Sequence, residues 1–494
     1  EEKETSAQRE IARFDADAVA LSYDGAQDRF PGIVDPQRED ATRYVMSGYD
    51  RAAGEEELKT DLAAADITWW PAWLGENDTI KTGVKFVAND LAQVRRTDVH
   101  AVKPGRAPDM SGFVAAWRRD DFLGRGFDPG VLPDAAAVGR WVAAHPDAVE
   151  RDDLVSALRS APASFTSRER VGAGYVMANI HAGRWRFLAG GRYEYTWLDS
   201  TGNEVIVGDP DFIVQPREAS NAYGNFFPSL HARYRLNPAT AVIASYTQTI
   251  RRPDFDDTAP FRIVETDERR IREGNPEARA MVYDNLDLAF DIEPAKGALV
   301  SWDWFYRAVS DSLYTATSTV ADGPFAGYRL ERIENGGDSS LWGSKLSWQQ
   351  DLGTVSARLS PFSWNLAYTF SQSSAEYPER PGESLPLAGV SEHDVQAALS
   401  YASERMYIQL GLELESRWLR RVSEVGPEKD VYMADIYYLN LLAEYRINPT
   451  WTAFIDWENI NRAFEEDARE GSGMRAYGYR WDPWKILVGV RFER

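Results

Sequence analysis

Apolar and polar residues alternate along many segments of this chain. The clearest case covers residues 406–418, where Met406, Ile408, Leu410, Leu412, Leu414 and Trp418 alternate with Gln409, Glu413, Glu415 and Arg417. Successive side chains of a strand point to opposite faces, so this period of two predicts a β-strand with one apolar face. Comparable runs flank the turn at 237–240 and cover 18–23, 43–49, 58–73, 79–102, 171–180, 184–197, 281–292, 298–309, 341–348, 362–371, 437–445, 451–457 and 484–492.

The connections between these predicted strands are of two kinds. Short turns are expected near Gly183, Asn237-Pro238, Pro294-Ala295-Lys296, Ser403-Glu404 and Asn448-Pro449. Long connections are expected over 103–166, 198–223, 253–279, 312–338, 375–390 and 465–479. The longest of them, 103–166, has helical patterns at 134–144 and 152–159, with Asp134 and Asp152 as N-caps. Short turns at one end and long loops at the other are typical of outer-membrane barrels.

The pattern therefore predicts an all-β fold, an antiparallel transmembrane β-barrel of which this chain supplies about fifteen strands. The mean hydropathy of −0.46 does not oppose this prediction. Only alternate residues of each strand face lipid, so a barrel hides its membrane signal. The 17 Trp and 23 Tyr suit the aromatic girdles of such barrels. Leu410, Leu412 and Leu414 are expected to face lipid, and Glu413 and Glu415 the lumen.

Composition excludes several classes of function. The formal net charge of −22 argues against a nucleic-acid partner, because binding there depends on cations that neutralise phosphates. The chain has no Cys, which excludes disulfides, iron–sulfur clusters and thiol catalysis. The first residues, EEKETSAQREIARF, contain no signal-peptide pattern.

No catalytic or metal-binding constellation is found. The five His (His100, His145, His181, His231 and His393) lack helical metal-site spacing, and no nucleotide or nucleophile-elbow motif is present. Asp254, Asp256 and Asp257 could bind Ca²⁺, but without the spacing of a calcium loop a solvated acidic turn is the preferred interpretation. The chain is therefore expected to be no enzyme and to hold no metal and no cofactor.

Ligand-binding candidates come from the long connections. Arg251 and Arg252 end a strand and could donate to an anionic or polyhydroxylated ligand, or else pair with acidic loops. Trp117 and Trp141 could stack on a sugar whose hydroxyls Arg118 and Arg119 bond, although Trp141 could equally anchor a loop helix. Asn275, within Gly274-Asn275-Pro276, is more simply a turn residue. The candidate set is Trp117, Arg118, Arg119, Trp141, Arg251, Arg252 and Asn275.

Several of these motifs together resemble a known family. Phe227-Pro228-Ser229-Leu230, the turn at Asn237-Pro238, Thr249-Ile250-Arg251-Arg252-Pro253 and Glu273-Gly274-Asn275-Pro276 are similar to the barrel of TonB-dependent outer-membrane receptors. So are Arg13-Phe14-Asp15-Ala16-Asp17, Glu169-Arg170-Val171 and Gly190-Gly191-Arg192-Tyr193-Glu194. The resemblance covers most of the chain in the family's order.

The resemblance implies that residues 1–494 correspond to the C-terminal part of a 22-stranded barrel, with the plug domain outside this chain. It implies a receptor in the outer membrane of a Gram-negative bacterium that imports a nutrient with energy from the TonB complex, reached through the plug. Its partners would be outer-membrane lipid, lipopolysaccharide and a small-molecule or oligosaccharide ligand, since the most similar subfamily is often tied to oligosaccharide uptake. The family's last strand usually ends on an aromatic residue, whereas Glu493 and Arg494 follow Phe492 here.

Two other functions remain open at this point: a passive outer-membrane pore, and a secreted all-β carbohydrate-active enzyme. The enzyme is disfavoured because the strands show no convergent pair of carboxylates. Strand closure would distinguish a pore from part of a receptor. A partial barrel predicts one free edge near 18–23 or 58–73 and another at 484–492, whereas a complete smaller barrel would pair them.

Overall fold

The computed structural model describes residues 2–16, 22–24, 32–34, 39–116, 130–208, 211–481 and 484–493. Its main feature is an antiparallel wall in which each long strand pairs with the next long strand along the chain. Within the described ranges sixteen strands form this wall: β1 (Glu2–Ala16), β4 (Tyr44–Trp69), β5 (Thr79–Val102), β7 (Phe165–Ala182), β8 (Trp185–Val207), β9 (Phe212–Asn237), β10 (Thr240–Arg251), β13 (Met281–Ala295), β14 (Ala298–Ser310), β17 (Ser339–Asp351), β18 (Phe362–Glu376), β20 (His393–Ala402), β21 (Met406–Glu415), β24 (Ile436–Arg446), β25 (Trp451–Glu458) and β28 (Lys485–Phe492).

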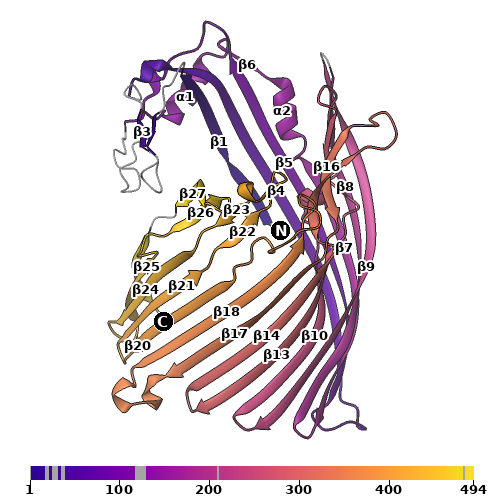
Figure 1. The fold of residues 1–494 in the computed structure, drawn as a ribbon, viewed down its shortest axis with the longest axis vertical. Helices are drawn as coiled ribbons and strands as arrows, with labels where there is room; N and C mark the ends of the chain where they lie inside the picture. The colour runs from indigo at the N-terminus through magenta and orange to yellow at the C-terminus, as the bar shows by residue number, and fades with distance from the viewer. Residues whose placement is uncertain are drawn as a thin grey trace.

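The wall is curved, and the turns after β13 and β17 lie at the end opposite α1 and α2 (Figure 1). The long connections carry their own helices, α1 (Ala135–Ala144), α2 (Asp153–Ser160) and α3 (Phe255–Thr258). They also carry the short strands β2 (Ser22–Asp24), β3 (Gly32–Val34), β6 (Val149–Arg151), β11 (Arg262–Glu265), β12 (Arg270–Glu273), β15 (Leu313–Thr319), β16 (Arg329–Asn335), β19 (Ser384–Leu385), β22 (Trp418–Arg421), β23 (Val431–Met433), β26 (Phe464–Glu470) and β27 (Arg475–Trp481). Single-turn 3₁₀ helices lie at Ala41–Arg43, Met110–Phe113, Leu352–Thr354, Ala357–Leu359 and Pro427–Lys429. No helix in these ranges has the length and apolar content needed to cross a membrane.

The two faces of the wall differ in chemistry. One cross-strand row consists of directly paired apolar residues, namely Trp364, Leu399, Leu410, Leu441 and Trp457. Leu399 and Leu410 are 49% and 47% exposed, so the loops leave this face uncovered. A groove on the wall is lined by the polar residues Gln349, Asn365, Gln396, Gln409, Glu413, Asn440 and Asp456, together with apolar residues that include Leu366, Leu412 and Leu442. The expected alternation of β21 is confirmed, because Leu410, Leu412 and Leu414 pair across the strands with Leu441, Leu439 and Tyr437.

The buried apolar residues lie where loops meet the wall rather than within a sandwich. One cluster joins Met46, Tyr49, Phe113 and Val138, with Trp141 packed against it. A second joins Leu91, Phe165 and Ala259, with Phe255 and Phe261 at its border. A third, at Val431, Met433 and Ala468, holds the small sheet β22–β23–β26–β27 together.

Both predicted helices form. Asp134 accepts hydrogen bonds from the backbone N–H groups of Ala136 and Ala137, and Asp152 accepts one from Val155. These side chains satisfy donors that the first helical turn leaves without a partner.

Two predictions of where strands begin and end are wrong. The predicted loop 198–223 is a continuation of β8 and β9, whose turn spans only 208–211. The predicted strands 43–49 and 58–73 are one strand, β4, which continues through the acidic run Glu55-Glu56-Glu57. Apolar and polar residues do not alternate in these two segments. Where water or loops cover both faces of a strand, neither face has to be apolar, so the pattern gives no signal.

The predicted edge at 18–23 or 58–73 is also wrong, because 58–69 belongs to β4, which pairs with both β1 and β5. Residues 17–21 lie outside the described ranges, and Ser22–Asp24 pairs with β3 rather than with the wall. The edge strand is β1, whose backbone pairs with β4. At the other edge β28 pairs with β25, as expected for 484–492. Among the described residues no backbone pairing joins β1 to β28, so the wall has two free edges.

Candidate ligand-binding site

The connection between β10 and β13, residues 252–280, folds back onto the polar face of the wall. At the start of this connection the Arg252 side chain reaches two wall strands. Its guanidinium donates to Glu194 of β8 at 2.6 Å and lies 3.7 Å from Glu169 of β7. Higher up, Phe255 and Phe261 pack against the cluster of Leu91 and Phe165. Charge and apolar contacts thus fix the same loop at two levels.

The next part of the loop forms a small sheet above the wall. β11 lies parallel to the end of β8, β12 pairs with β11, and β16 of the next loop runs parallel to β12. The sequence favours this arrangement because Arg262–Glu265 (RIVE) and Arg270–Glu273 (RIRE) pair antiparallel and place Arg262 opposite Glu273. Opposite charges directly across a strand pair stabilise such short strands.

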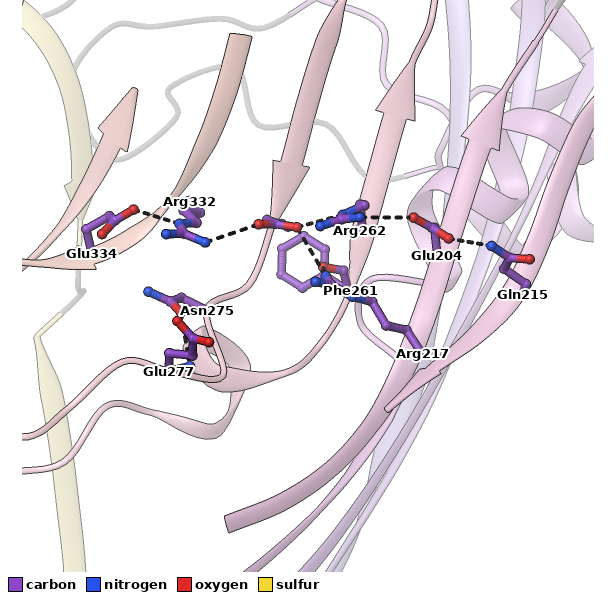
Figure 2. A network of polar contacts seen from close by, with 10 residues as sticks. Glu204, Gln215, Arg217, Phe261, Arg262, Asn275, Glu277, Arg332 and Glu334 are labelled. Carbon is purple, nitrogen blue, oxygen red and sulfur yellow. Dashed lines mark hydrogen bonds and ion pairs between the residues drawn. The ribbon is translucent and has the colours of Figure 1, made fainter. Parts of the chain in front are cut away.

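Glu273 is the centre of this sheet. Its side chain is only 5% exposed, and its carboxylate accepts hydrogen bonds from Arg262 at 2.6 Å, Arg217 at 3.2 Å and Arg332 at 3.4 Å. Figure 2 shows the chain of contacts running from Glu334 through Arg332 to Arg262, Glu204 and Gln215. Arg217, on β9, also donates to the carbonyl of Phe261. One buried carboxylate therefore connects the wall to two loops.

The three arginines remain partly accessible. Their side chains are 27%, 29% and 30% exposed for Arg217, Arg262 and Arg332. Burial opposes the charge of Arg332, but the hydrogen bond to Glu334 and the charge of Glu273 raise the pKa of its guanidinium. A guanidinium that is fixed in place and still reaches solvent can donate to an anionic or hydroxyl-rich ligand.

A second buried ion pair joins the loops that follow β18, β21 and β25. Arg380 donates to Asp430 at 3.2 Å, and both side chains are almost fully buried. Asp430 also accepts a hydrogen bond from the backbone N–H of Ser423, and its own carbonyl accepts one from Gly471. This pair connects the loops that contain residues 377–392, 416–435 and 459–484.

The structure distributes the sequence-predicted residues among different roles. Trp117, Arg118 and Arg119 lie outside the described residues. Trp141 packs edge-on against Phe113 and stacks on His145 within α1. Arg251 is exposed and lies 3.8 Å from Asp254. Arg252 is paired within the wall, as described above.

Asn275 ties two loops together. Its side chain donates to the carbonyl of Ile333 at 2.8 Å and accepts from the backbone N–H of Glu277 at 3.0 Å. Its backbone N–H donates to the carbonyl of Asp257. Asn275 thus positions β12 against β16, beside the arginines of Glu273.

The acidic turn at 254–257 starts helix α3, and its carboxylates do not converge. Burial, and then the charges of Asp254 and Asp256, raise the pKa of Asp257. Across the described part of the chain no group of three or more His, Asp or Glu has the geometry of a metal site.

The sequence prediction missed Glu273, Arg217, Arg262 and Arg332. The alternating charges of RIVE and RIRE are a local signal for a paired hairpin, and they could have indicated Arg262 and Glu273. Arg217 and Arg332 are 56 and 59 residues away from Glu273, so no local pattern predicts those contacts.

The comparisons with known proteins agree with this architecture. Residues 13–460 match the family model described as TonB dependent receptor-like, beta-barrel. No curated protein sequence shows significant similarity to the chain.

Solved structures share the fold at low sequence identity. The ferric-catecholate import receptor Fiu of E. coli K12 is 12% identical with a TM-score of 0.57, over 92% of this chain and 57% of that chain. The ferric citrate transporter FecA in its unliganded form is 11% identical with a TM-score of 0.54, over 91% of this chain and 56% of that chain. The copper transporter OprC is 12% identical with a TM-score of 0.52, over 93% of this chain and 64% of that chain.

The chain thus spans less than two thirds of the length of each of these structures. The family model matches residues 13–460, which is most of this chain, and the fold agrees with that of a solved receptor. The chain belongs to the TonB-dependent receptor-like β-barrel family.

Proposed function

We propose that this chain is the C-terminal part of the barrel of an outer-membrane receptor that imports a small-molecule nutrient. Its apolar face would contact lipid and its polar face the lumen, while the long connections form the ligand site at the cell surface. The observation that carries the proposal is the layer of long loops, which the buried Glu273 carboxylate joins to a wall of this family and which the Arg380–Asp430 pair joins to one another. Outer-membrane lipid and lipopolysaccharide would surround the apolar face.

The energy for import would come from the TonB complex through a plug domain. The free edges of β1 and β28 support this part of the proposal, because unpaired backbone groups in lipid cost several kcal/mol each. Further strands of the same barrel would cover them. The pore hypothesis required β1 and β28 to pair, and the described residues do not show that pairing.

The ligand would be anionic or rich in hydroxyl groups. Arg217, Arg262 and Arg332 supply fixed, partly exposed donors at the centre of the loop layer. Two structural neighbours are a ferric-catecholate import receptor and a ferric citrate transporter, and a ferric chelate of such a kind would bind these donors. An oligosaccharide would use the same donors together with Trp117, Arg118, Arg119 and Trp141. Arg251, Arg252 and Asn275 would border this site.

Binding measurements on the purified receptor test the ligand class. A panel of ferric chelates and neutral oligosaccharides is titrated by calorimetry against the unmodified protein and against Arg262→Ala. The proposal expects a ligand whose affinity falls at least tenfold in Arg262→Ala and stays unchanged in the control Arg106→Ala, which removes an exposed arginine that lies 3.5 Å from Asp147. A current through planar bilayers without ligand or energy source would favour the passive pore instead.

A further inference from the structure

The polar groove of the wall lies midway along the later strands. It crosses the strands from β14 to β25 and has a volume of about 630 Å³, within the roughly 300–1,000 Å³ of small-molecule sites. On β21 it covers residues 409–413, between the short turn at Ser403 and the loop that follows Glu415. The groove therefore lies between the loop layer and the short turns.

Small side chains form the floor of the groove. Ala398 of β20 and Gly411 of β21 pair directly in one cross-strand row. Asn365 of β18 and Asn440 of β24 flank them in the same row. Because Gly has no side chain and Ala has only a methyl group, the row is lowest at its middle and is bordered by amides. The hollow thus follows from the residues that the strands place side by side.

Several polar side chains around this floor are not paired within the protein. Five of them make no side-chain hydrogen bond and no ion pair with any residue that the structure describes, namely Asn365, Gln396, Gln409, Glu413 and Asp456. By contrast, Glu194 on the same face of the wall pairs with Arg252. Unpaired donors and acceptors around a hollow are free to bind a ligand.

The lining of the groove is acidic. Glu413, Asp456 and Glu458 lie along it, and its described residues include no lysine or arginine. Of the three carboxylates, Glu458 alone lies within ion-pair distance of a described cation, 3.9 Å from Lys485. An anionic chelate in the groove would face like charges, which repel it. A neutral hydroxyl group, by contrast, can donate to a carboxylate and accept from an amide.

The groove and the arginine site of the loop layer make different demands on a ligand. The three guanidiniums beside Glu273 donate hydrogen bonds and accept none, whereas the carboxylates of Glu413 and Asp456 accept and donate none. An anion satisfies only the arginines. A hydroxyl group satisfies both sites, because its oxygen accepts a hydrogen bond and its proton is donated in another.

We propose that the groove is a second binding site for a neutral ligand rich in hydroxyl groups, such as an oligosaccharide. Glu413 accepts hydrogen bonds from the hydroxyls, and Gln396, which pairs with Glu413 from the neighbouring strand β20, donates to their oxygens. The inference rests on the proposed import function and narrows its ligand to the neutral class. The ligand would meet the arginines first and the groove afterwards, on its way toward the short turns.

Calorimetry on the complete receptor tests the groove. Trisaccharides of glucose, galactose, mannose and xylose, together with ferric citrate, are titrated against the unmodified protein, Gln396→Ala and Glu413→Gln. Both side chains are exposed, so these substitutions should leave the fold intact. A trisaccharide should bind, and each substitution should weaken its affinity about threefold to tenfold, the effect of losing one hydrogen bond. The control is Gln372→Ala, which removes an exposed amide of β18 seven residues beyond Asn365, on the opposite face, and should leave the affinity unchanged.

The outcomes separate this inference from the import function. A trisaccharide whose affinity falls in Arg262→Ala but not in Gln396→Ala or Glu413→Gln would overturn the groove and leave the receptor standing. If no trisaccharide binds, the neutral ligand is wrong, whether or not ferric citrate binds. A trisaccharide whose affinity is unchanged in all three variants would overturn both the groove and the arginine site.

Chemical labelling shows whether the groove is open, because this chain contributes no native Cys. In the ligand-free complete receptor Gln396→Cys should react with iodoacetamide, and the bound trisaccharide should slow that reaction several-fold. A thiol that is already protected before any sugar is added would mean that another part of the receptor fills the groove, and the ligand site would be overturned.

Discussion

Single buried carboxylates determine where the loops of this protein lie. Asp50 accepts hydrogen bonds from Arg13 of β1 and Arg159 of α2, and it is 3% exposed. Glu273 and Asp430 likewise accept hydrogen bonds from arginines of other segments. Each carboxylate joins segments far apart in sequence, so a conservative substitution at one atom should release a whole loop.

Glu273→Gln tests this role. The substitution keeps the size of the side chain but replaces the carboxylate that three partly exposed guanidiniums share by a neutral amide, and the loss of such charge-assisted hydrogen bonds costs about 2 kcal/mol. We expect faster hydrogen exchange in β11 and β12 while the wall strands keep their protection. The control is Glu268→Gln, since Glu268 is 60% exposed and pairs with Arg270; its cost should stay below about 1 kcal/mol. Equal exchange in the two variants would contradict the role of Glu273.

Tyr49 lies where β4 packs against Phe113 and against Val138 of α1, and it should make the docking of α1 sensitive to alkaline pH. Burial, followed by the neighbouring carboxylate of Glu10, raises the pKa of Tyr49 to about 12. The folded state holds this proton more tightly than the unfolded chain, so the stabilisation is complete below about pH 10. It is lost as the pH rises from there to 12. Limited proteolysis of the loop at 103–164 should therefore accelerate over that interval.

The change should disappear in Tyr49→Phe, which cannot ionise. A loop that becomes sensitive to protease over the same interval in Tyr49→Phe would rule out Tyr49 as the cause.

At the scale of elements, the sequence predicts the strands best where one face is apolar. The pattern locates β21 correctly because its apolar residues recur at every second position. It ends β8 too early because the alternation fades beyond Trp197, where Asp199 and Thr201 take the same face. The Glu273 site could not be predicted for a related reason. Its arginines come from β9, β11 and β16, and only the topology of the loops brings them together.

The faces of β21 provide an element-scale prediction. Leu410→Arg places a charge on the lipid-facing row and should reduce the free energy of folding into a bilayer by about 2–4 kcal/mol. Gln409→Arg adds the same side chain one position earlier, on the polar face beside Glu413, and should be nearly neutral. Denaturant titration of both variants in phospholipid vesicles measures the difference. Greater loss in Gln409→Arg would mean that the two faces are reversed.

At the scale of the molecule, β1 and β28 are the two edges of the wall, and no pairing between them is found among the described residues. If further strands close the barrel in the complete receptor, cysteines introduced along β1 and β28 should form no disulfide with one another. Ile455 and Val488 face each other directly across β25 and β28, so their cysteine variants supply the positive control. An efficient β1–β28 disulfide would show instead a closed barrel of sixteen strands, and the function would shift toward a passive pore.

Labelling of intact cells tests the central claim most directly. In the proposed topology the long connections lie at the cell surface and the short turns lie in the periplasm. A membrane-impermeant maleimide should therefore react with Asp322→Cys, in the loop between β15 and β16, and should not react with Glu404→Cys until the outer membrane is permeabilised. Reaction at residue 404 but not at 322 in intact cells would invert the topology. Equal reaction at both residues would contradict a membrane-spanning wall.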